Sequence, residues 1–383
     1  MSKPTGVKTW VEISAAALLA NAQALRRQTA PAKLAAVIKA NAYGHGATVV
    51  ASALRTAADW FAVDSFLEAE ALKPLRLKQP ILILGYTPVS AVASAVRRGY
   101  RLTAYNRETV QAAAKAATAS HPARLHLKIE TGTTRQGIGI GELSALVRDL
   151  RRSRHVIVEG ASTHYANVED TADPGYARQQ LSRYEEALAK LATLGIKPSV
   201  RHTAGSAAAI LYPETRFDLV RTGLALYGLW PSGETKAAMR LRGGRFDLRP
   251  VLTWKTTVAQ VKTVPAGTPV SYGLTEKTGR SSRLAVLPVG YWDGLDRKLS
   301  SVGSVLIRGQ RAKIMGRVCM NMCVVDVTDI PGVSVEDEAV ILGSQGSERL
   351  SAEEIARQCG TINYEIVTRI NPLLPRYPAA RRK

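Results

Sequence analysis

Cysteine, aromatic residues and long apolar runs are all scarce in this chain of 383 residues. The three cysteines, Cys319, Cys323 and Cys359, form no Cys-x-x-Cys pair. That pattern argues against a disulfide framework or a structural zinc site, and it suits a reducing cytoplasm. No run approaches the roughly 18 apolar residues of a membrane helix, and the polar first residues do not resemble a secretory leader. We therefore expect a cytoplasmic globular protein with no membrane partner.

Acidic residues are also few relative to basic ones. The chain has 52 Lys and Arg against 31 Asp and Glu, a net charge of +21. A nucleic-acid-binding protein would explain such an excess. The basic residues are spread out, however, down to the tail Arg381–Lys383, and no segment interleaves them with stacking aromatics. We interpret the excess as a solvated surface that attracts anionic cofactors, and we expect no nucleic-acid partner.

From Leu34 onward, short apolar runs alternate with Ala- and Leu-rich stretches such as Thr109–Ala119 and Tyr176–Leu194, which favour helix. Eight alternations over about 230 residues predict a closed parallel (β/α)₈ barrel. An open doubly wound sheet would show the same alternation, and only the count of eight favours the barrel. The expected strands are Leu34–Lys39, Trp60–Asp64, Pro80–Leu84, Leu102–Tyr105, Arg124–Ile129, Val156–Gly160, Ser199–His202 and Phe217–Arg221.

The pattern changes after Leu229. The stretch Pro231–Arg249 is rich in Gly and Arg and has no clear period, as is typical of a linker. Beyond it, alternation at period two predicts a mostly antiparallel β domain. Its strand-like runs are Val251–Val264, Arg283–Val289, Ser304–Ile307 and Met322–Val327. The expected fold class is thus α/β, with a barrel over residues 1–240 and a β domain over residues 241–383.

Polar side chains follow five of the predicted barrel strands, where functional groups of such barrels gather. Lys39 follows the first strand; a lysine on the inner side of a barrel is costly to desolvate, and its amine can attack a carbonyl cofactor. Backbone N–H groups near Ser206 and Gly223 suit a phosphate after the last two strands. One such residue alone more often has a structural role, but polar groups after five strands favour a functional site. The residues are Lys39, Lys128 with Arg135, His164, His202 with Ser206, and Arg221 with Gly223 and Leu224.

The segment Ala36–Gly46, AVIKANAYGHG, resembles the cofactor-lysine signature of the alanine racemase family. The resemblance continues in order along nearly the whole chain. It runs through Thr131-Gly132, Arg135, His164, Ser206, Arg221, Gly223, Val270–Gly273, Gly290-Tyr291, Asp293-Gly294, Gly316–Asn321 and Asn363–Glu365. It implies a pyridoxal 5'-phosphate (PLP) barrel joined to a β domain, acting as a head-to-tail homodimer. The implied reaction interconverts L- and D-alanine, which supplies D-alanine for peptidoglycan.

The resemblance also implies roles for individual residues. Lys39 would carry the cofactor and act as one acid–base group, and Tyr272 would be the opposing base in the partner subunit's active site. Arg221 would face the pyridine nitrogen, while His164 would pack beside the ring and bond to Arg221, with His202 nearby. The phosphate ligands would be Tyr43, Ser206, Gly223, Leu224 and Tyr364. The remaining substrate or cofactor contacts would be Arg135, and Met320 and Asn321 of the second subunit. Lys128 matches a lysine that can be carbamylated and would orient Arg135.

These residue types fit the implied chemistry. Racemisation removes the α-proton from one face and returns a proton to the other, so it needs a base on each side. Arginine is effectively never deprotonated, so Arg221 cannot accept a ring proton. A neutral ring is a weaker electron sink, which should limit transamination.

Several alternatives remain open. Glu130, Thr133, Gly205 and Thr222 stand where Asp, Met, Asn and Pro are usual in the family, and such changes bear on substrate breadth. A broad-specificity or serine-preferring racemase is therefore one alternative. A PLP-dependent decarboxylase is disfavoured, because an acidic partner of the ring nitrogen is expected there instead of Arg221. A PLP carrier built on the barrel alone would lack the domain with Tyr272.

Overall fold

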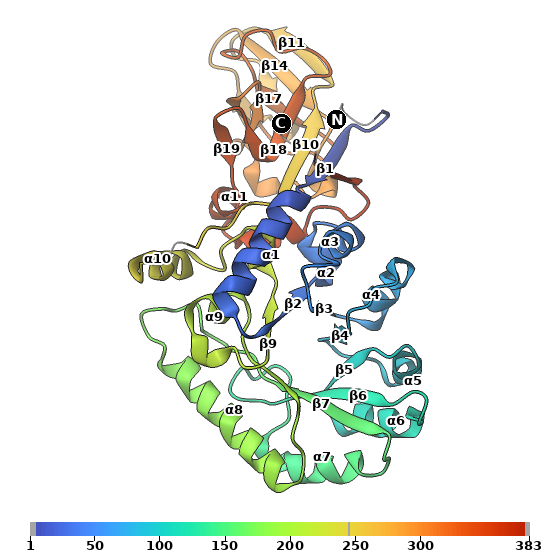
Figure 1. Ribbon diagram of the computed structural model, residues 1–383. Coiled ribbons are helices and arrows are strands. Elements are labelled where there is room, and N and C mark those ends of the chain that lie inside the picture. Colours follow the sequence, from blue (N-terminus) through green and yellow to red (C-terminus); the bar gives the residue numbers. More distant parts are fainter. Residues whose placement is uncertain (1–4, 244–245, 380–383) are drawn as a thin grey trace. The chain divides into compact units, whose positions relative to one another are not determined.

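The computed structural model describes residues 5–243 and 246–379, so the basic tail Arg381–Lys383 lies outside the described residues. The chain divides into two compact units. One consists of Leu18–Ala42 and Val50–Arg249, and the other of Met1–Ala17, Tyr43–Val49 and Pro250–Lys383. The first unit contains the barrel strands and the second contains most of the remaining strands (Figure 1).

The first unit is the predicted parallel (β/α)₈ barrel. Its eight strands are hydrogen-bonded in the order β8-β7-β6-β5-β4-β3-β2-β9. The ring closes between β9 and β8, where the Asp218 N–H donates to Arg201 O and the Arg221 N–H donates to Ala204 O, both at 3.0 Å. The strands are β2 (Lys33–Val37), β3 (Trp60–Val63), β4 (Ile81–Ile83), β5 (Arg101–Ala104), β6 (Ala123–Lys128), β7 (Val156–Ser162), β8 (Val200–His202) and β9 (Leu219–Thr222).

Apolar strand residues such as Leu34, Phe61 and Leu125 are fully buried, which is why these runs lack polar alternation. The intervening helices take up the Ala- and Leu-rich stretches. They are α1 (Ala15–Thr29), α3 (Ala47–Ala53), α4 (Phe66–Ala71), α5 (Val89–Arg97), α6 (Arg107–Ala116), α7 (Leu143–Leu150), α8 (Gly175–Thr193) and α9 (Ser206–Leu211). The short segment α2 (Lys39–Tyr43) has left-handed backbone and is a turn.

The stretch Pro231–Arg249, expected to be a linker, contains a helix, α10 (Gly233–Leu241). Ser232 caps it, because its Oγ accepts the N–H of Thr235 at 3.0 Å. The expectation of a linker was wrong for these residues. Ser232 followed by Glu234 in the first turn is a helix-start signal, which the high Gly and Arg content of the stretch made easy to overlook.

The second unit is mostly antiparallel β, as predicted. One sheet has the order β16-β15-β18-β10-β1-β20 with β19 beside β18, and a second has the order β11-β14-β17. The strands are β1 (Thr9–Ile13), β10 (Leu252–Thr257), β11 (Gln260–Val264), β12 (Pro269–Val270), β13 (Glu276–Lys277), β14 (Ser282–Leu287), β15 (Ser304–Ile307), β16 (Gln310–Lys313), β17 (Cys323–Asp326), β18 (Glu338–Gln345), β19 (Glu348–Leu350) and β20 (Arg376–Pro378). Two helices follow β19: α11 (Ala352–Cys359) and α12 (Asn363–Thr368).

Two features of this unit differ from the sequence pattern. The run Val251–Val264 is two strands in different sheets, since β10 pairs with β1 and β18 whereas β11 pairs with β14. The N-terminal strand β1 gave no strand signal and pairs antiparallel with β10. Its partner lies more than 200 residues away in sequence, so only tertiary pairing reveals it.

No helix within residues 5–243 and 246–379 has the length and apolar character to cross a membrane. Over the same described ranges, no group of three or more His, Cys, Asp or Glu side chains is placed to hold a metal ion.

Candidate active site

Lys39 opens a short turn of unusual hand at the end of β2. Ala40, Asn41, Ala42 and Tyr43 have φ values of 51°, 53°, 55° and 52°. Left-handed backbone costs an L-residue about 1–2 kcal/mol, so the turn must be held by its surroundings. Glu68 supplies one such contact, because its Oε1 accepts the Ala40 N–H at 2.8 Å.

The Lys39 side chain is 41% exposed, and its Nζ lies 4.0 Å from Asp64 Oδ1. The expectation that this lysine is strongly desolvated in the barrel interior was therefore wrong. The strand ends at Val37, so Lys39 lies beyond the buried part of β2, and the left-handed turn follows it from Ala40 onward. Its amine is accessible to a ligand at the C-terminal end of the barrel strands.

The end of the turn belongs to the second unit, where Gly44 is structurally required. Its φ is 81°, and an added Cβ would lie 1.9 Å from Val367 O. The Gly44 carbonyl accepts two N–H groups of Arg376, from Nε at 3.2 Å and Nη2 at 3.0 Å. The Tyr43 and Tyr364 rings lie 6.2 Å apart, so two of the predicted phosphate ligands are neighbours. Burial raises the pKa of Tyr43 to about 12.

Arg221 on β9 is buried and makes four side-chain hydrogen bonds. Nη1 donates to His202 Nδ1 and His202 O, both at 2.7 Å. Nη2 donates to Thr163 O at 2.8 Å and Thr203 O at 2.9 Å. The fifth N–H, on Nε, meets no acceptor among residues 5–243 and 246–379. All the acceptors are neutral, and burial lowers the pKa of Arg221 to about 10.

The histidine bonded to Arg221 is His202, not His164 as the resemblance implied. Burial first, and then the charges of Arg221, Lys128 and Arg135, lower the pKa of His164 well below its usual range. Both histidines are therefore neutral at pH 7. The four side-chain bonds of the guanidinium go to His202, Thr163 and Thr203, and none goes to His164.

Lys128, at the end of β6, stands in the same positive field. Burial, followed by the charges of Arg221 and Arg135, lowers the pKa of Lys128 to about 7. After β6, Glu130 Oε1 accepts the N–H groups of Gly132 at 2.5 Å and Thr134 at 3.1 Å, which shapes the loop that carries Arg135. The end of the barrel thus gathers cationic side chains that were predicted from separate strand ends.

Ser206 joins the ends of β8 and β9, as expected of a phosphate cradle. It begins α9, and its Oγ accepts the N–H of Gly223 at 3.1 Å and of Ala225 at 3.4 Å. Leu224 is buried next to these groups. The two chain segments predicted to share a phosphate are therefore in direct contact.

Tyr272 lies in the second unit on a strained loop after β12. Ser271, Gly273 and Leu274 have φ values of 64°, 74° and 50°. Ser271 Oγ donates to Arg317 O at 2.7 Å, which ties this loop to the segment that carries Met320 and Asn321. Tyr272 itself is 75% exposed. The loop geometry holds the phenol out from the body of its own unit.

The second predicted substrate segment is equally constrained. The Trp292 N–H donates to Met320 O at 2.9 Å, and a Cβ on Gly290 would lie 2.4 Å from that oxygen. Met320 and Asn321 are both exposed. The structure thus divides the predicted residues between the two compact units, with Tyr43, Tyr272, Met320, Asn321 and Tyr364 in the second and the others in the first.

The barrel group fits PLP on its own contacts. The unpartnered Nε–H of Arg221 suits a neutral ring nitrogen, because a protonated nitrogen would meet a donor. Burial first, and then the charges of Arg221, Lys128 and Arg135, lower the pKa of His164, and these cationic side chains suit an anionic cofactor. Ser206 Oγ accepts the Gly223 N–H and keeps its own O–H as a donor for a phosphate.

Comparisons with known proteins agree with this arrangement. Residues 13–231 match the family described as alanine racemase, N-terminal domain, and residues 251–378 match alanine racemase, C-terminal domain. An alanine racemase of Symbiobacterium thermophilum is 42% identical over 371 residues, covering 96% of each chain. A crystal structure of alanine racemase from Streptomyces lavendulae aligns with a TM-score of 0.89 at 36% identity, covering 98% of each chain. One from Bacillus anthracis with bound L-Ala-P aligns with a TM-score of 0.91 at 33% identity, covering 99% of this chain and 97% of that one.

The fold and the strand-end groups define a barrel enzyme with a cationic site for an anionic ligand. With the two domain families matched over residues 13–231 and 251–378, the chain belongs to the alanine racemase family.

Proposed function

We propose that this protein interconverts L-alanine and D-alanine with PLP as cofactor, and so supplies D-alanine for peptidoglycan. The observation that carries the proposal is the buried Arg221, whose Nε–H alone is left for a ring nitrogen among the described residues. Bound PLP withdraws electrons from the α-carbon of an attached amino acid, which makes its α-proton acidic. The family membership and the relatives named alanine racemase support alanine as the substrate.

In this proposal Lys39 holds the cofactor through its amine and moves the α-proton on one face of the substrate. The left-handed turn sets the direction of that amine, and its partial exposure leaves it free to react. Tyr272 moves the proton on the other face. Arg135, Met320 and Asn321 would bind the substrate carboxylate, and Tyr43, Ser206, Gly223, Leu224 and Tyr364 the phosphate.

Arg221 would limit side reactions. As a permanent cation it cannot take a proton from the ring nitrogen, so the ring stays neutral. His202 accepts from Arg221 and keeps the guanidinium plane fixed, while His164 packs beside the ring without adding charge. A neutral ring favours return of the proton to the α-carbon.

We further propose that the enzyme works as a homodimer in which Tyr272, Met320 and Asn321 complete the site of a partner copy. The second unit exposes several large apolar side chains, which is unusual for a solvated surface. They are Tyr272, Leu274, Tyr291, Trp292, Met320 and Met322. A second copy would bury them together with Tyr272.

The reaction can be tested directly with the purified protein, PLP and L-alanine in deuterated water. We expect loss of optical rotation together with deuterium exchange at the α-carbon. Serine, lysine and arginine under the same conditions measure substrate breadth. Release of carbon dioxide would instead identify a decarboxylase, and bound cofactor without exchange on any amino acid would identify a carrier.

We also propose that Lys128 is carbamylated and thereby orients Arg135. Only the neutral amine reacts with carbon dioxide, and a pKa of about 7 makes a large neutral fraction available near neutrality. The negative product would lie among cations. In ¹³C-bicarbonate, a carbamate signal should grow from pH 6 to pH 8 and be absent in Lys128→Arg. A pH-independent signal, or one that persists in the variant, would refute the assignment.

A further inference from the structure

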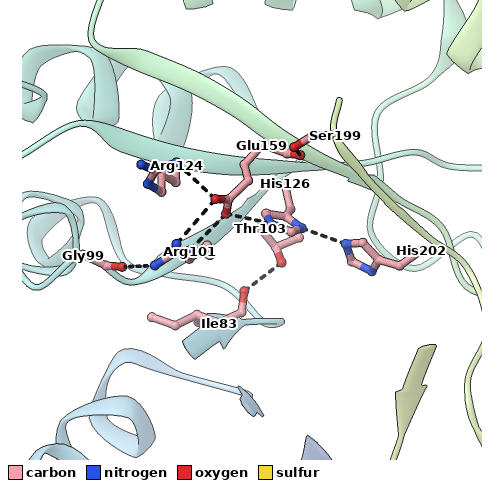
Figure 2. A network of polar contacts seen from close by, with 9 residues as sticks. All are labelled: Ile83, Gly99, Arg101, Thr103, Arg124, His126, Glu159, Ser199 and His202. Atoms are coloured by element: carbon pink, nitrogen blue, oxygen red, sulfur yellow. Dashed lines mark hydrogen bonds and ion pairs between the residues drawn. The ribbon is translucent and has the colours of Figure 1, made fainter. Parts of the chain in front are cut away.

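We propose that His126 and Glu159 are positioning residues that fix the tautomer of His202, and thereby the orientation of Arg221, through a one-directional chain of hydrogen bonds inside the barrel. This inference rests on the proposed role of Arg221. Figure 2 shows the distal part of the chain, with Glu159 among Arg101, Arg124 and His126, and His202 on the other side of His126.

The direction of the chain follows from its first member. The Arg221 guanidinium has only donors, so His202 Nδ1, 2.7 Å from Nη1, must be an acceptor without a proton. A neutral His202 then carries its proton on Nε2 and donates it to His126 Nδ1 at 2.7 Å. His126 must in turn carry its proton on Nε2, which points at Glu159 Oε2, 3.4 Å away.

The far end of the chain is anchored by a carboxylate. Arg101 Nε donates to Glu159 Oε2 at 3.0 Å, and Arg124 Nη1 donates to Oε1 at 3.1 Å. Burial alone would raise the pKa of Glu159, but the hydrogen bonds from His126 and Arg101 lower it to about 2. Glu159 is therefore an anion that can only accept. Burial lowers the pKa of both His126 and His202, so both rings stay neutral and each keeps one donor and one acceptor.

Two features of β7 build this arrangement. The register between β6 and β7 jumps from Leu125–Val158 to His126–Gly160, so Glu159 is the extra residue of a β-bulge. Bulges re-aim a side chain, and this one turns the carboxylate towards His126. Gly160 leaves room for the ring, because a Cβ there would lie 2.2 Å from His126 Nδ1. Nothing in the reaction proposed above requires either feature.

The chain has a specific consequence for Arg221. If His202 carried its proton on Nδ1, that N–H would face the Nη1–H of Arg221, two donors at 2.7 Å. The guanidinium would have to turn, and its Nε–H would leave the ring nitrogen. The Glu159 anion needs a donor, so it disfavours the alternative in which His126 and His202 both carry their protons on Nδ1. The expected effect of losing the anchor is thus on reaction specificity as well as on rate.

Nitrogen NMR of the purified protein as isolated, labelled with ¹⁵N-histidine, tests the chain directly. The protein has 6 histidines, and the spectra of His126→Gln and His202→Gln assign the two signals. We expect both rings to be neutral with the proton on Nε2. A proton on Nδ1 of either ring, or a doubly protonated ring, overturns the proposal. The result does not depend on whether PLP catalyses the reaction, so failure of the proposed function would be seen separately.

Glu159→Gln then tests the functional consequence. A neutral amide can donate as well as accept, so we expect mixed tautomers at both histidines. We also expect kcat to fall about tenfold, as for one lost hydrogen bond to a charged group. The ratio of transamination to racemisation should rise. Glu186→Gln, on the exposed face of α8, is the charge-matched control and should change none of these. Gly160→Ala should shift the same signals with all three polar residues intact. Unchanged tautomers and an unchanged reaction ratio in Glu159→Gln would overturn the inference.

Discussion

Replacing Lys39 with alanine should abolish the yellow absorbance of covalently held cofactor and lower racemisation by at least about 10³-fold, the upper part of the range for loss of an acid–base group. The substitution removes both the attachment point and one of the two proton carriers. Absorbance spectra and α-proton exchange measured on one preparation separate the two losses. Absorbance retained at the same wavelength as in the wild-type protein would refute the assignment of Lys39.

A matched control lies on the same strand. Lys33 is the first residue of β2, at the end of the strand opposite to Lys39, and it is exposed. Lys33→Ala should therefore keep the absorbance and the rate. The left-handed turn begins only after Lys39, so alanine at position 39 should not disturb it. An exogenous primary amine should restore part of the exchange in Lys39→Ala, because the missing group is an amine.

Much of the barrel could be predicted from the sequence because its signal is local. The strands β2, β3, β4 and β9 are short runs that are almost wholly buried, and helix-forming stretches separate most of the barrel strands in sequence. The β unit was harder. β1 was missed because five residues at the chain start carry no period of their own, and their partner strand is β10. The split of Val251–Val264 into two strands was missed because both halves alternate at period two.

The same distinction holds for the site. Lys39, Arg221 and Ser206 could be predicted because each directly follows or ends a strand and carries its own chemistry. His126 and Glu159 lie inside strands, where the pattern gives them the appearance of ordinary interior polar residues. Their relation depends on a one-residue register shift between β6 and β7. The bond from Arg376 to Gly44 is likewise invisible in sequence, since 332 residues separate the two.

Replacing Tyr272 with phenylalanine should slow racemisation strongly while leaving the cofactor bound. The phenol is 75% exposed in its own chain, so its removal should change the free energy of unfolding by less than about 0.5 kcal/mol. Loss of one of two bases should slow racemisation by about 10²–10⁴-fold. Lys39 can still exchange the proton on its own face, so deuterium should enter one alanine enantiomer and not the other. Equal loss of exchange with both enantiomers, or loss of cofactor, would make Tyr272 structural.

Mixing the two defective variants tests whether Tyr272 serves its own subunit or a partner. If it serves the partner, a mixed dimer of Lys39→Ala and Tyr272→Phe has one site in which both bases are intact and one in which both are missing. Random reassortment at equal amounts makes half of the dimers mixed, so activity should recover to about a quarter of the wild-type value. If Tyr272 acts within its own chain, every site in every dimer lacks one base and no activity returns. The recovery should also require conditions in which subunits exchange, because mixing without exchange leaves each variant paired with itself.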